Sequence, residues 1–201
     1  RAPAAGRESR DESRGRVSRA LAVHGRLHLL AQVHGAHVVE APWEGCPEGD
    51  AGVAEAPGAL LGIETADCLP VLLVDPRRRA VAAAHAGWRG AAAGVAARAA
   101  SALFERGSRP ADLLAALGPA IGPCCYEVGE ELREVLPAAV FRPGPRGRPH
   151  LDLRAANVGQ LLEAGVSPAR VHHVDACTRC RADLYPSWRR DGRGSGRMIS
   201  F

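Results

Sequence analysis

Runs of apolar residues separated by turn residues predict a hairpin of two buried strands near the middle of the chain. Residues 71–74 form an unbroken apolar run that is typical of a buried strand. Residues 75–78 supply turn chemistry, and residues 81–85 form a second apolar run that can pair with the first. Cys68 precedes the first run and His85 ends the second. We therefore expect both side chains at the same end of the hairpin, within reach of one ion.

Other segments show either helical spacing or short strand-like runs. Predicted helices extend from 11 to 25, from 87–90 to 105, from 128 to 136, and from 153 to 164 after a capping Asp152. Predicted strands are 27–33, 37–39, 113–117 and 171–174, with loops at 42–57, 118–123 and 143–149. Because strands and helices do not alternate strictly, the pattern predicts a mixed α+β fold rather than a doubly wound sheet.

Length and composition predict a single domain. With 201 residues, of which 46% are apolar, the chain is long enough for one well-buried core and short for two. We expect a flexible lead-in at 1–10 and one catalytic domain at 11–201. No apolar run approaches the ~20 residues that cross a bilayer. The six cysteines are expected to stay reduced, so we predict a cytoplasmic protein without membrane contacts.

Basic charge is spread along the chain rather than concentrated. The formal net charge is +4, and all 26 basic residues are arginines, since the sequence has no lysine. The arginines are scattered or mixed with acids, as in residues 7–12. Aromatic residues that could stack on bases do not interleave with them. This pattern argues against a nucleic-acid partner.

Three side chains form the strongest candidate site: His34, Cys68 and His85. Each lies beside a glycine or in a short apolar frame at the end of a predicted strand, where side chains converge on a cleft. Two imidazoles and one thiolate suit zinc, and three protein ligands leave the fourth tetrahedral position free, as a catalytic zinc requires. The spacing of the three residues matches no general zinc motif, so the hypothesis rests on local context.

A second group of potential metal ligands lies later in the chain. Its members are His172, His173, Cys177 and Cys180, and the two thiols of the second pair could in principle join Cys124 and Cys125 in a four-thiolate structural site. The Cys-X-X-Cys spacing of residues 177–180 suits zinc or redox chemistry. Adjacent cysteines point apart on an extended backbone, however. We therefore expect thiols packed near the active cleft and leave a second metal open.

Two charged residues near the trio are candidates for anion binding and proton transfer. Arg89 stands at a predicted helix start, where a cation opposes the helix dipole unless an anion binds nearby, and phosphate is the natural anion. Asp67 directly precedes Cys68 and would orient a ligand, accept a substrate proton or cap a loop. Residues 188–192 are either a solvated segment or part of the site.

The segments around these candidate residues together resemble a known family, the multicopper polyphenol oxidoreductase or laccase-domain proteins. Its members are also called YfiH-like proteins, purine nucleoside phosphorylases or peptidoglycan editing factors. The resemblance extends from about Glu12 to the C-terminus. The matching segments are 32–35 (QVHG), 65–70 (TADCLP), 84–90 (AHAGWRG), 118–129 (GPAIGPCCYEVG), 152–153 with Asn157 and 160–161, 177–178, and 187–192 (SWRRDG). Several of them are long and uninterrupted, which makes the resemblance specific.

The resemblance implies a fold, a metal and an activity. The fold is a four-layer α/β/β/α sandwich with mixed sheets and flanking helices, shared with bacterial cytotoxic cysteine hydrolases. The metal is zinc on His34, Cys68 and His85. The activity is phosphorolysis of adenosine, inosine and methylthioadenosine, with deamination of adenosine, so purine nucleosides and phosphate are the partners of a monomer or small homo-oligomer. The implied catalytic residues are Asp67, Cys68, His85 and Arg89, and the implied substrate-binding residues are Arg89, Gly90, Cys125, Thr178 and Arg190.

The sequence departs from the family pattern toward its N-terminal side. The family's N-terminal strands, which carry a Gly-Val-Ser and Asn-Leu pattern, are absent from the sequence, and Ser13 replaces the Asn that usually precedes Arg14. We therefore expect part of one sheet, and with it one wall of the substrate pocket, to be incomplete.

The copper implied by the laccase label conflicts with the residues present. A multicopper site needs many histidines, often in His-X-His pairs, whereas this chain has eight histidines and no such pair. A blue-copper centre also favours an axial Met, and the only Met is Met198, near the end of the chain. We therefore expect zinc rather than copper.

Two alternative functions remain open. Cys68 and His85 need only hydrogen-bond reach to act as nucleophile and base, so the chain could be a cysteine hydrolase that removes a wrong residue from a cell-wall precursor. It could also be a non-catalytic, zinc-stabilised partner protein, which a closed four-ligand zinc would favour. The usual nucleobase-deaminase signature, His-X-Glu with Pro-Cys-X-X-Cys, is absent, so any deamination must use a different scaffold.

Overall fold

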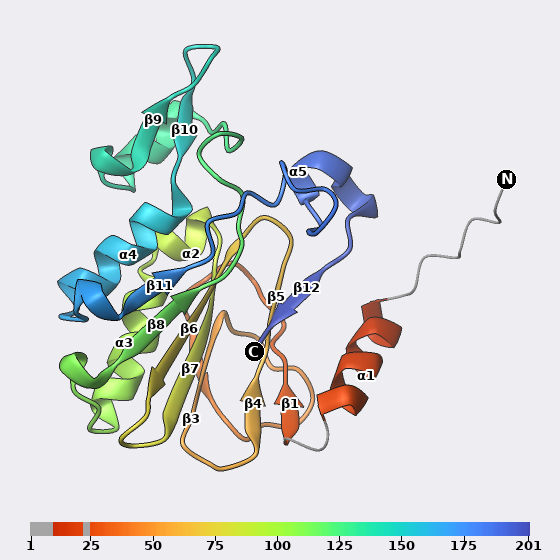
Figure 1. Ribbon diagram of the computed structural model, residues 1–201, viewed down its shortest axis with the longest axis vertical. Helices are drawn as coiled ribbons and strands as arrows, with labels where there is room; N and C mark the ends of the chain where they lie inside the picture. Colours follow the sequence, from red (N-terminus) through yellow and green to blue (C-terminus); the bar gives the residue numbers. More distant parts are fainter. Residues whose placement is uncertain (1–9, 22–24) are drawn as a thin grey trace, which may run out of the picture.

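A six-stranded mixed sheet lies at the centre of the computed structural model, which describes residues 10–21 and 25–201 (Figure 1). From one edge to the other its strands are β11 (Val171–His173), β8 (Leu114–Leu117), β6 (Leu69–Asp75), β7 (Ala80–Ala86), β3 (Ala51–Ala54) and β2 (Val38–Glu40). The pair at each edge is parallel and the inner pairs are antiparallel. The mixed sheet confirms the predicted α+β class. The predicted lead-in at 1–10 lies, except for its last residue, outside the described residues.

The predicted hairpin is formed by β6 and β7. The Asp75 carboxylate accepts the backbone N–H groups of Arg77 and Arg78 at 2.9 and 3.1 Å, which fixes the turn between the two strands. The register places Pro70 opposite His85. Cys68, two residues before Pro70, therefore lies at the same end of the hairpin as His85, as the sequence pattern predicts.

Helices cover one face of this sheet (Figure 1). They are α2 (Trp88–Ala92), α3 (Val95–Glu105) and α4 (Leu153–Glu163). The sheet-facing side of α3 includes Ala96, Ala99 and Leu103, which are fully buried. Short alanine side chains let the helix approach the sheet closely, and burial of one leucine stabilises the fold by roughly 2 kcal/mol.

Two small sheets cover part of the opposite face. Their strands are β1 (Arg26–His28) with β4 (Ala59–Leu61), and β5 (Ile63–Thr65) with β12 (Met198–Ser200). Helix α1 (Arg10–Leu21) lies outside them, and its Arg14 guanidinium makes two hydrogen bonds with the buried Glu64 carboxylate. The layers therefore follow the predicted order of helices, large sheet, small sheets and helix (Figure 1).

Shorter elements complete the described chain. The hairpin of β9 (Phe141–Pro143) and β10 (Pro149–Leu151) extends at the top of Figure 1, and α5 (Trp188–Asp191) precedes the C-terminal strand. The 3-10 turns are Pro110–Asp112, Glu130–Glu134, Ala138–Val140, Pro168–Arg170 and Gly192–Gly194. Within residues 10–21 and 25–201, no helix has the length and apolar character that a bilayer crossing requires.

The prediction of a surface loop at 42–57 is wrong for its second half, because β3 lies there and all of its residues are buried. Val53 is the only β-branched residue in this strand, and alanines and a glycine occupy its other positions. Its Gly52 packs so closely against Trp43 that a Cβ would come within 2.9 Å of the indole ring. The small residues therefore make room for Trp43 beneath the strand, and they resemble a loop when only composition is considered.

Two helix predictions also need correction. The helix expected from 87–90 to 105 is two helices, because Gly94 adopts a left-handed conformation with φ of 75° between them. The helix expected at 128–136 is only a 3-10 turn. The predicted cap of α4 is confirmed, since the Asp152 carboxylate accepts the backbone N–H of Ala155 at 2.9 Å.

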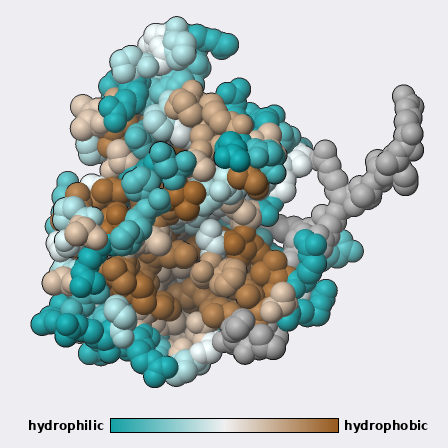
Figure 2. Space-filling view, viewed as in Figure 1, coloured by the Kyte–Doolittle hydropathy of each residue, from teal (hydrophilic) through white to brown (hydrophobic). Residues whose placement is uncertain are grey.

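An apolar groove of about 500 Å³ lies on the face of the large sheet opposite the helices. Its walls come from β4, β6, β7 and β8 with Phe201, and Figure 2 shows apolar side chains gathered on this side of the molecule. His172 is the only titratable side chain among its lining residues. The groove therefore offers apolar surface but few groups for catalysis.

Candidate metal centre and substrate pocket

His34, Cys68 and His85 meet at one end of the large sheet. Their ligand atoms lie within 4.8 Å of one another, and the two imidazole rings meet edge to face with centroids 4.8 Å apart. Cys68 directly precedes β6, His85 lies near the end of β7, and His34 occupies a tight turn before β2. The hairpin register and this turn thus bring together residues from distant parts of the sequence, as predicted.

A buried carboxylate that the sequence analysis missed, Asp50, orients both histidines. One of its oxygens accepts the Nδ1–H of His85 at 2.8 Å and the backbone N–H of His34 at 2.9 Å. The other accepts the backbone N–H of Gly35 at 2.6 Å. The turn needs this support because His34 has a φ of 64°, in the left-handed region. With Nδ1 bound to Asp50, Nε2 of His85 is left for a metal.

Charges in the trio are strongly coupled. Burial raises the pKa of the Cys68 thiol, but its contacts with His34 and His85 outweigh burial and bring the pKa down to about 7. Burial lowers the pKa of His85, but hydrogen bonds with Asp50 and Cys68 raise it to about 9. Burial likewise raises the pKa of Asp50, and its bond with His85 and the N–H of Gly35 give a net lowering. Without a metal, Cys68 and His85 therefore form a thiolate–imidazolium pair between about pH 7 and pH 9.

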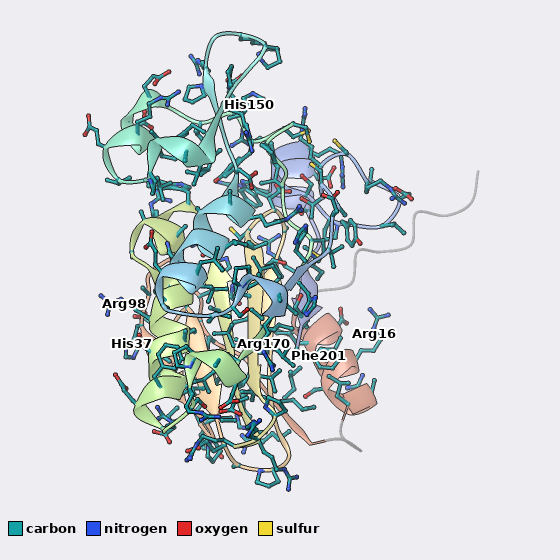
Figure 3. All side chains as sticks on the ribbon, turned by 60° about the vertical axis from the view of Figure 1, so that its left-hand side comes forward. Arg16, His37, Arg98, His150, Arg170 and Phe201 are labelled. Atoms are coloured by element: carbon teal, nitrogen blue, oxygen red, sulfur yellow. The ribbon has the colours of Figure 1, made fainter. Side chains whose placement is uncertain are left out.

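The donor set fits a metal ion with an open coordination position. One sulfur and two imidazole nitrogens converge, which suits zinc. Elsewhere in the described chain, His150 lies on the β9–β10 hairpin (Figure 3), where its Nδ1 is hydrogen-bonded to the carbonyl of Pro123 at 2.6 Å. Among the described residues, the group that holds these three ligand atoms contains no fourth.

A pocket of about 450 Å³ opens beside the trio. This volume lies in the range of small-molecule sites. Three aromatic and three cationic side chains line it: Trp88, Tyr126, Trp188, Arg89, Arg189 and Arg197. The pocket therefore combines flat apolar surfaces with positive charge next to a metal-binding group of side chains.

Of the predicted substrate-binding residues, Arg89 alone lines this pocket. Its guanidinium lies 4.3 Å from the centre of the Trp88 ring, a cation–π contact. Gly90 is buried behind the pocket, where a Cβ would come within 3.1 Å of the carbonyl oxygens of Gly35 and His85. It therefore allows close backbone packing at the base of the metal centre.

Thr178 and Arg190, two further predicted residues, connect the pocket to the C-terminal segment together with Asp67. The Thr178 hydroxyl donates to Asp67 at 2.6 Å, and the other Asp67 oxygen accepts the backbone N–H of Arg189 at 2.6 Å. The Arg190 guanidinium donates to the carbonyls of Thr178 and Tyr185, each at 3.0 Å. Asp67 and Arg190 thus hold the segment that carries Arg189 and Trp188 against the pocket.

Positive charge near the predicted anion site comes from side chains rather than from a helix dipole. The helix that begins at Trp88 is only five residues long, and a dipole grows with the number of aligned peptide units. Arg89, Arg189 and Arg197 supply positive charge within the pocket lining. Sequence reasoning missed Arg197, which lies two residues after Ser195 in a glycine-rich stretch that shows no periodicity.

The second group of potential ligands divides in the structure. Cys124, Cys125, Cys177 and Cys180 bring their sulfur atoms within 4.8 Å of one another, and we call them the four-thiol cluster. His172 and His173 lie apart from it on strand β11 and are exposed. The expectation that adjacent cysteines point apart is wrong here, because residues 123–125 form a turn rather than an extended chain.

Comparisons with known proteins match nearly the whole chain, including the trio and the pocket. The family model described as multi-copper polyphenol oxidoreductase laccase matches residues 6–201. The chain belongs to this family. A purine nucleoside phosphorylase of Deinococcus radiodurans is 42% identical over an alignment 198 residues long, which covers 93% of this chain and 74% of the relative. The adenosine deaminase RL5, from an unknown prokaryotic organism, is 39% identical over 158 residues, 75% of this chain and 60% of the relative.

Solved structures of family relatives have the same fold. YfiH of Bacillus licheniformis superposes with a TM-score of 0.86 at 29% identity, covering 94% of this chain and 79% of that one. YlmD of Geobacillus stearothermophilus superposes with a TM-score of 0.85 at 34% identity, covering 94% of this chain and 77% of that one. Both likenesses confirm the mixed α+β fold.

The family name suggests copper, and the trio does contain the His₂Cys donor set of a blue-copper centre. Such a centre adds a weak axial ligand, commonly Met. Met198 pairs with Thr65 across strands β12 and β5, and it is not among the residues that line the pocket. The donors present therefore suit an open zinc site better than a copper centre.

Proposed function

We propose that this chain is a zinc-dependent purine nucleoside enzyme that phosphorolyses adenosine, inosine and methylthioadenosine and deaminates adenosine. The observation that carries the proposal is the trio of His34, Cys68 and His85, which opens on a pocket with aromatic and cationic walls. The names of the relatives, purine nucleoside phosphorylase and adenosine deaminase, support the same chemistry.

His34, Cys68 and His85 would hold the metal, with Asp50 keeping the His85 ring in place. When bound, zinc would supply Lewis acidity and lower the pKa of water. The chain's own contribution is orientation. Asp50 is fully buried and contacts both histidines, so it limits their movement when substrate enters.

The aromatic walls are suited to a purine base. Trp88, Tyr126 and Trp188 line the pocket, and stacking on aromatic side chains contributes roughly 1–3 kcal/mol per base. Burial raises the pKa of the Tyr126 phenol, so the hydroxyl keeps its proton and can donate a hydrogen bond to a purine nitrogen. These side chains would place the base beside the trio.

The arginines are suited to phosphate. For phosphorolysis, Arg89 and Arg189 would hold phosphate against C1′ of the ribose; the C1′–O bond forms as the bond from C1′ to the base nitrogen breaks. The products are the free base and the 1-phosphate of the sugar, which is ribose 1-phosphate for adenosine and inosine. Arg189 is held from behind, since its backbone N–H donates to Asp67 and its guanidinium to the carbonyl of Glu127 at 2.9 Å.

Deamination requires a group that moves a proton between water and the leaving amine. Asp67 lies at the pocket wall, and one of its oxygens accepts the hydroxyl hydrogen of Thr178. A hydroxyl can rotate to another acceptor, which would free that oxygen for a proton. Water adds at C6 of adenosine as ammonia leaves, and the product is inosine.

A product assay tests this proposal. Protein purified with its metal is incubated with adenosine, with and without phosphate, and the products are separated by chromatography. We expect adenine and ribose 1-phosphate only with phosphate, and inosine in both. Cys68→Ser should lose both activities, whereas Cys46→Ser, which changes an exposed thiol outside the pocket lining, should keep them. Absence of turnover by metal-replete protein with each of the three nucleosides would overturn the proposal.

One observation favours cysteine hydrolysis as a second candidate. The thiolate–imidazolium pair of Cys68 and His85 is the state in which a cysteine attacks an amide carbonyl. A peptide amide of a cell-wall precursor would be such a substrate. Protein stripped of metal should then hydrolyse the amide, and zinc should inhibit it, which is opposite to the nucleoside reaction. The open coordination position and adjoining pocket disfavour a purely structural, non-catalytic role.

A further inference from the structure

The four-thiol cluster joins two loops at the rim of the pocket. Cys124 and Cys125 lie in the loop that follows β8, and Cys177 and Cys180 lie in the segment that follows β11. The Cys180 sulfur is 3.8 Å from that of Cys124 and 3.4 Å from that of Cys125. All four sulfur atoms lie within 4.8 Å of one another. The cluster shares no residue with the trio.

These distances suit one metal ion better than two disulfides. Ligands at a Zn–S distance of 2.3 Å in a tetrahedron place the sulfurs about 3.8 Å apart. A disulfide requires about 2.05 Å, and all six cysteines are free. Cys180 is moreover close to two different sulfurs, whereas a disulfide would join it to one.

The backbone around the cluster supports thiolate ligands. The N–H of Gly122 donates to the Cys177 sulfur at 3.2 Å. A Cβ on Gly122 would lie 3.3 Å from the Cys124 sulfur, a tight contact that the glycine avoids. The Arg179 guanidinium also reaches the Cys125 sulfur at 3.5 Å. These donors offset the negative charge that four thiolates bring to one ion.

We propose that Cys124, Cys125, Cys177 and Cys180 bind a second zinc ion in a closed, structural tetrathiolate site. Four sulfur ligands fill the tetrahedral shell and leave no position for substrate. The inference is independent of the proposed nucleoside activity, because it concerns ligands outside the pocket lining. Neither the relatives' names nor the family name describes this second site.

The proposed zinc would brace one wall of the substrate pocket. Tyr126, which lines the pocket, directly follows one ligand, Cys125. Thr178, which lies between the two later ligands, donates its hydroxyl to Asp67 and its backbone N–H to the carbonyl of Ala120 at 3.0 Å. The ion would thus fasten together two loops that otherwise meet through a few hydrogen bonds.

Metal content per chain tests the proposal. Protein purified without oxygen in the presence of zinc is dialysed, and its zinc is measured by mass spectrometry. We expect two zinc ions per chain, one for each cluster. Cys68→Ser and Cys180→Ser should each retain one, and Cys46→Ser should retain both. One ion in the wild type that disappears in Cys68→Ser would overturn the proposal, as would loss of two hydrogens per disulfide in the intact mass.

Two further readouts keep the test decisive if Cys180→Ser is poorly folded. Cobalt bound to Cys68→Ser should give the intense thiolate-to-cobalt absorption of several sulfur ligands, and weak or absent absorption would contradict the site. A chelator should lower the melting temperature of Cys68→Ser, whereas Cys68→Ser/Cys180→Ser should show no such decrease. Because both comparisons use a background without the trio's metal, failure of the nucleoside proposal would leave them unchanged.

Discussion

The trio and the four-thiol cluster both gather cysteine, but they are built on different parts of the fold. Cys68 and His85 lie at the ends of paired strands, and a buried carboxylate holds the imidazole of His85. The four thiols lie on loops, and Cys124 and Cys180 are exposed. The trio has three donors facing a pocket, whereas the cluster has four donors facing each other. Donor number and surroundings, rather than the presence of cysteine, separate the proposed reactive metal site from the proposed structural one.

The two sites also differ in how their ligands are oriented. In the trio, Asp50 is a charged acceptor that fixes a histidine ring. In the cluster, an N–H donor from Gly122 and the guanidinium of Arg179 contact sulfur directly. Histidine ligands need an acceptor behind them and thiolates need donors, so each site has the polarity its ligands require. Variants that remove these supports should affect one site and spare the other.

The largest expected effect is that of Cys68→Ser. Loss of the only sulfur ligand in the trio should reduce nucleoside turnover to background and release the trio's zinc, because the hydroxyl is a far weaker zinc ligand than a thiolate. Zinc in the four-thiol cluster should stay. Turnover and zinc content of the same preparation provide the measurement, and unchanged turnover without the trio's zinc would show that the metal is not needed.

Asp50→Asn should have the next largest effect. The amide has one acceptor oxygen where the carboxylate has two, so contacts with His85 and the turn at His34 cannot all persist. Loss of such an outer contact lowers metal affinity by about 10–100-fold. Competition with a zinc chelator measures the change. Asp183→Asn, which alters an exposed ion pair, is the control and should leave affinity unchanged. An equal loss in both variants would refute the orienting role of Asp50.

Arg89→Ala should weaken phosphorolysis more than deamination, because only phosphorolysis needs phosphate. A hydrogen bond to a charged group contributes about 1.5–3 kcal/mol, so we expect the KM for phosphate to rise by roughly 10–100-fold. Arg98, on α3 and outside the pocket (Figure 3), provides a matched Arg→Ala control. Equal losses of the two activities in Arg89→Ala would argue against a phosphate contact.

The pH dependence of zinc binding to stripped protein should be steep for the trio. The pKa of Cys68 is lowered to about 7 and that of His85 is raised to about 9, so zinc must displace the His85 proton throughout the neutral range. Affinity should therefore rise from pH 6 to pH 9 and level off above. Proton release on binding, measured by calorimetry in two buffers, checks the sign. Affinity that falls as pH rises would contradict the thiolate–imidazolium pair.

The sequence alone predicts the hairpin and the approach of Cys68 to His85 because both depend on local patterns. The apolar runs, the turn after Asp75 and the positions of Cys68 and His85 all lie within one short segment. Asp50 could not be recognised, since it directly precedes a short strand of mostly small residues in a segment whose glycines and prolines suggest a loop. Pairing with β7, a long-range contact, decides that this segment is a strand.

The same limit applies to the four thiols and to the chain's C-terminal segment. Cys124 and Cys125 both face the other two thiols because of a turn in which the N–H of Cys125 donates to the carbonyl of Gly122 at 2.9 Å. The contact of Arg189 with Asp67 joins residues far apart in sequence. Sequence patterns identify the residue types, but tertiary contacts decide which of them meet.

The smallest effect should come from Thr178→Val, which tests whether the cluster's segment communicates with the pocket. Valine keeps the shape but removes the hydroxyl that donates to buried Asp67 at 2.6 Å, and an unsatisfied buried acceptor costs about 1–3 kcal/mol. We expect a lower free energy of unfolding and a several-fold higher KM for nucleoside, with zinc retained in both sites. Thr178→Ser should restore both values. If Thr178→Val instead loses zinc from the four-thiol cluster, the two sites are coupled more tightly than their separate ligand sets imply.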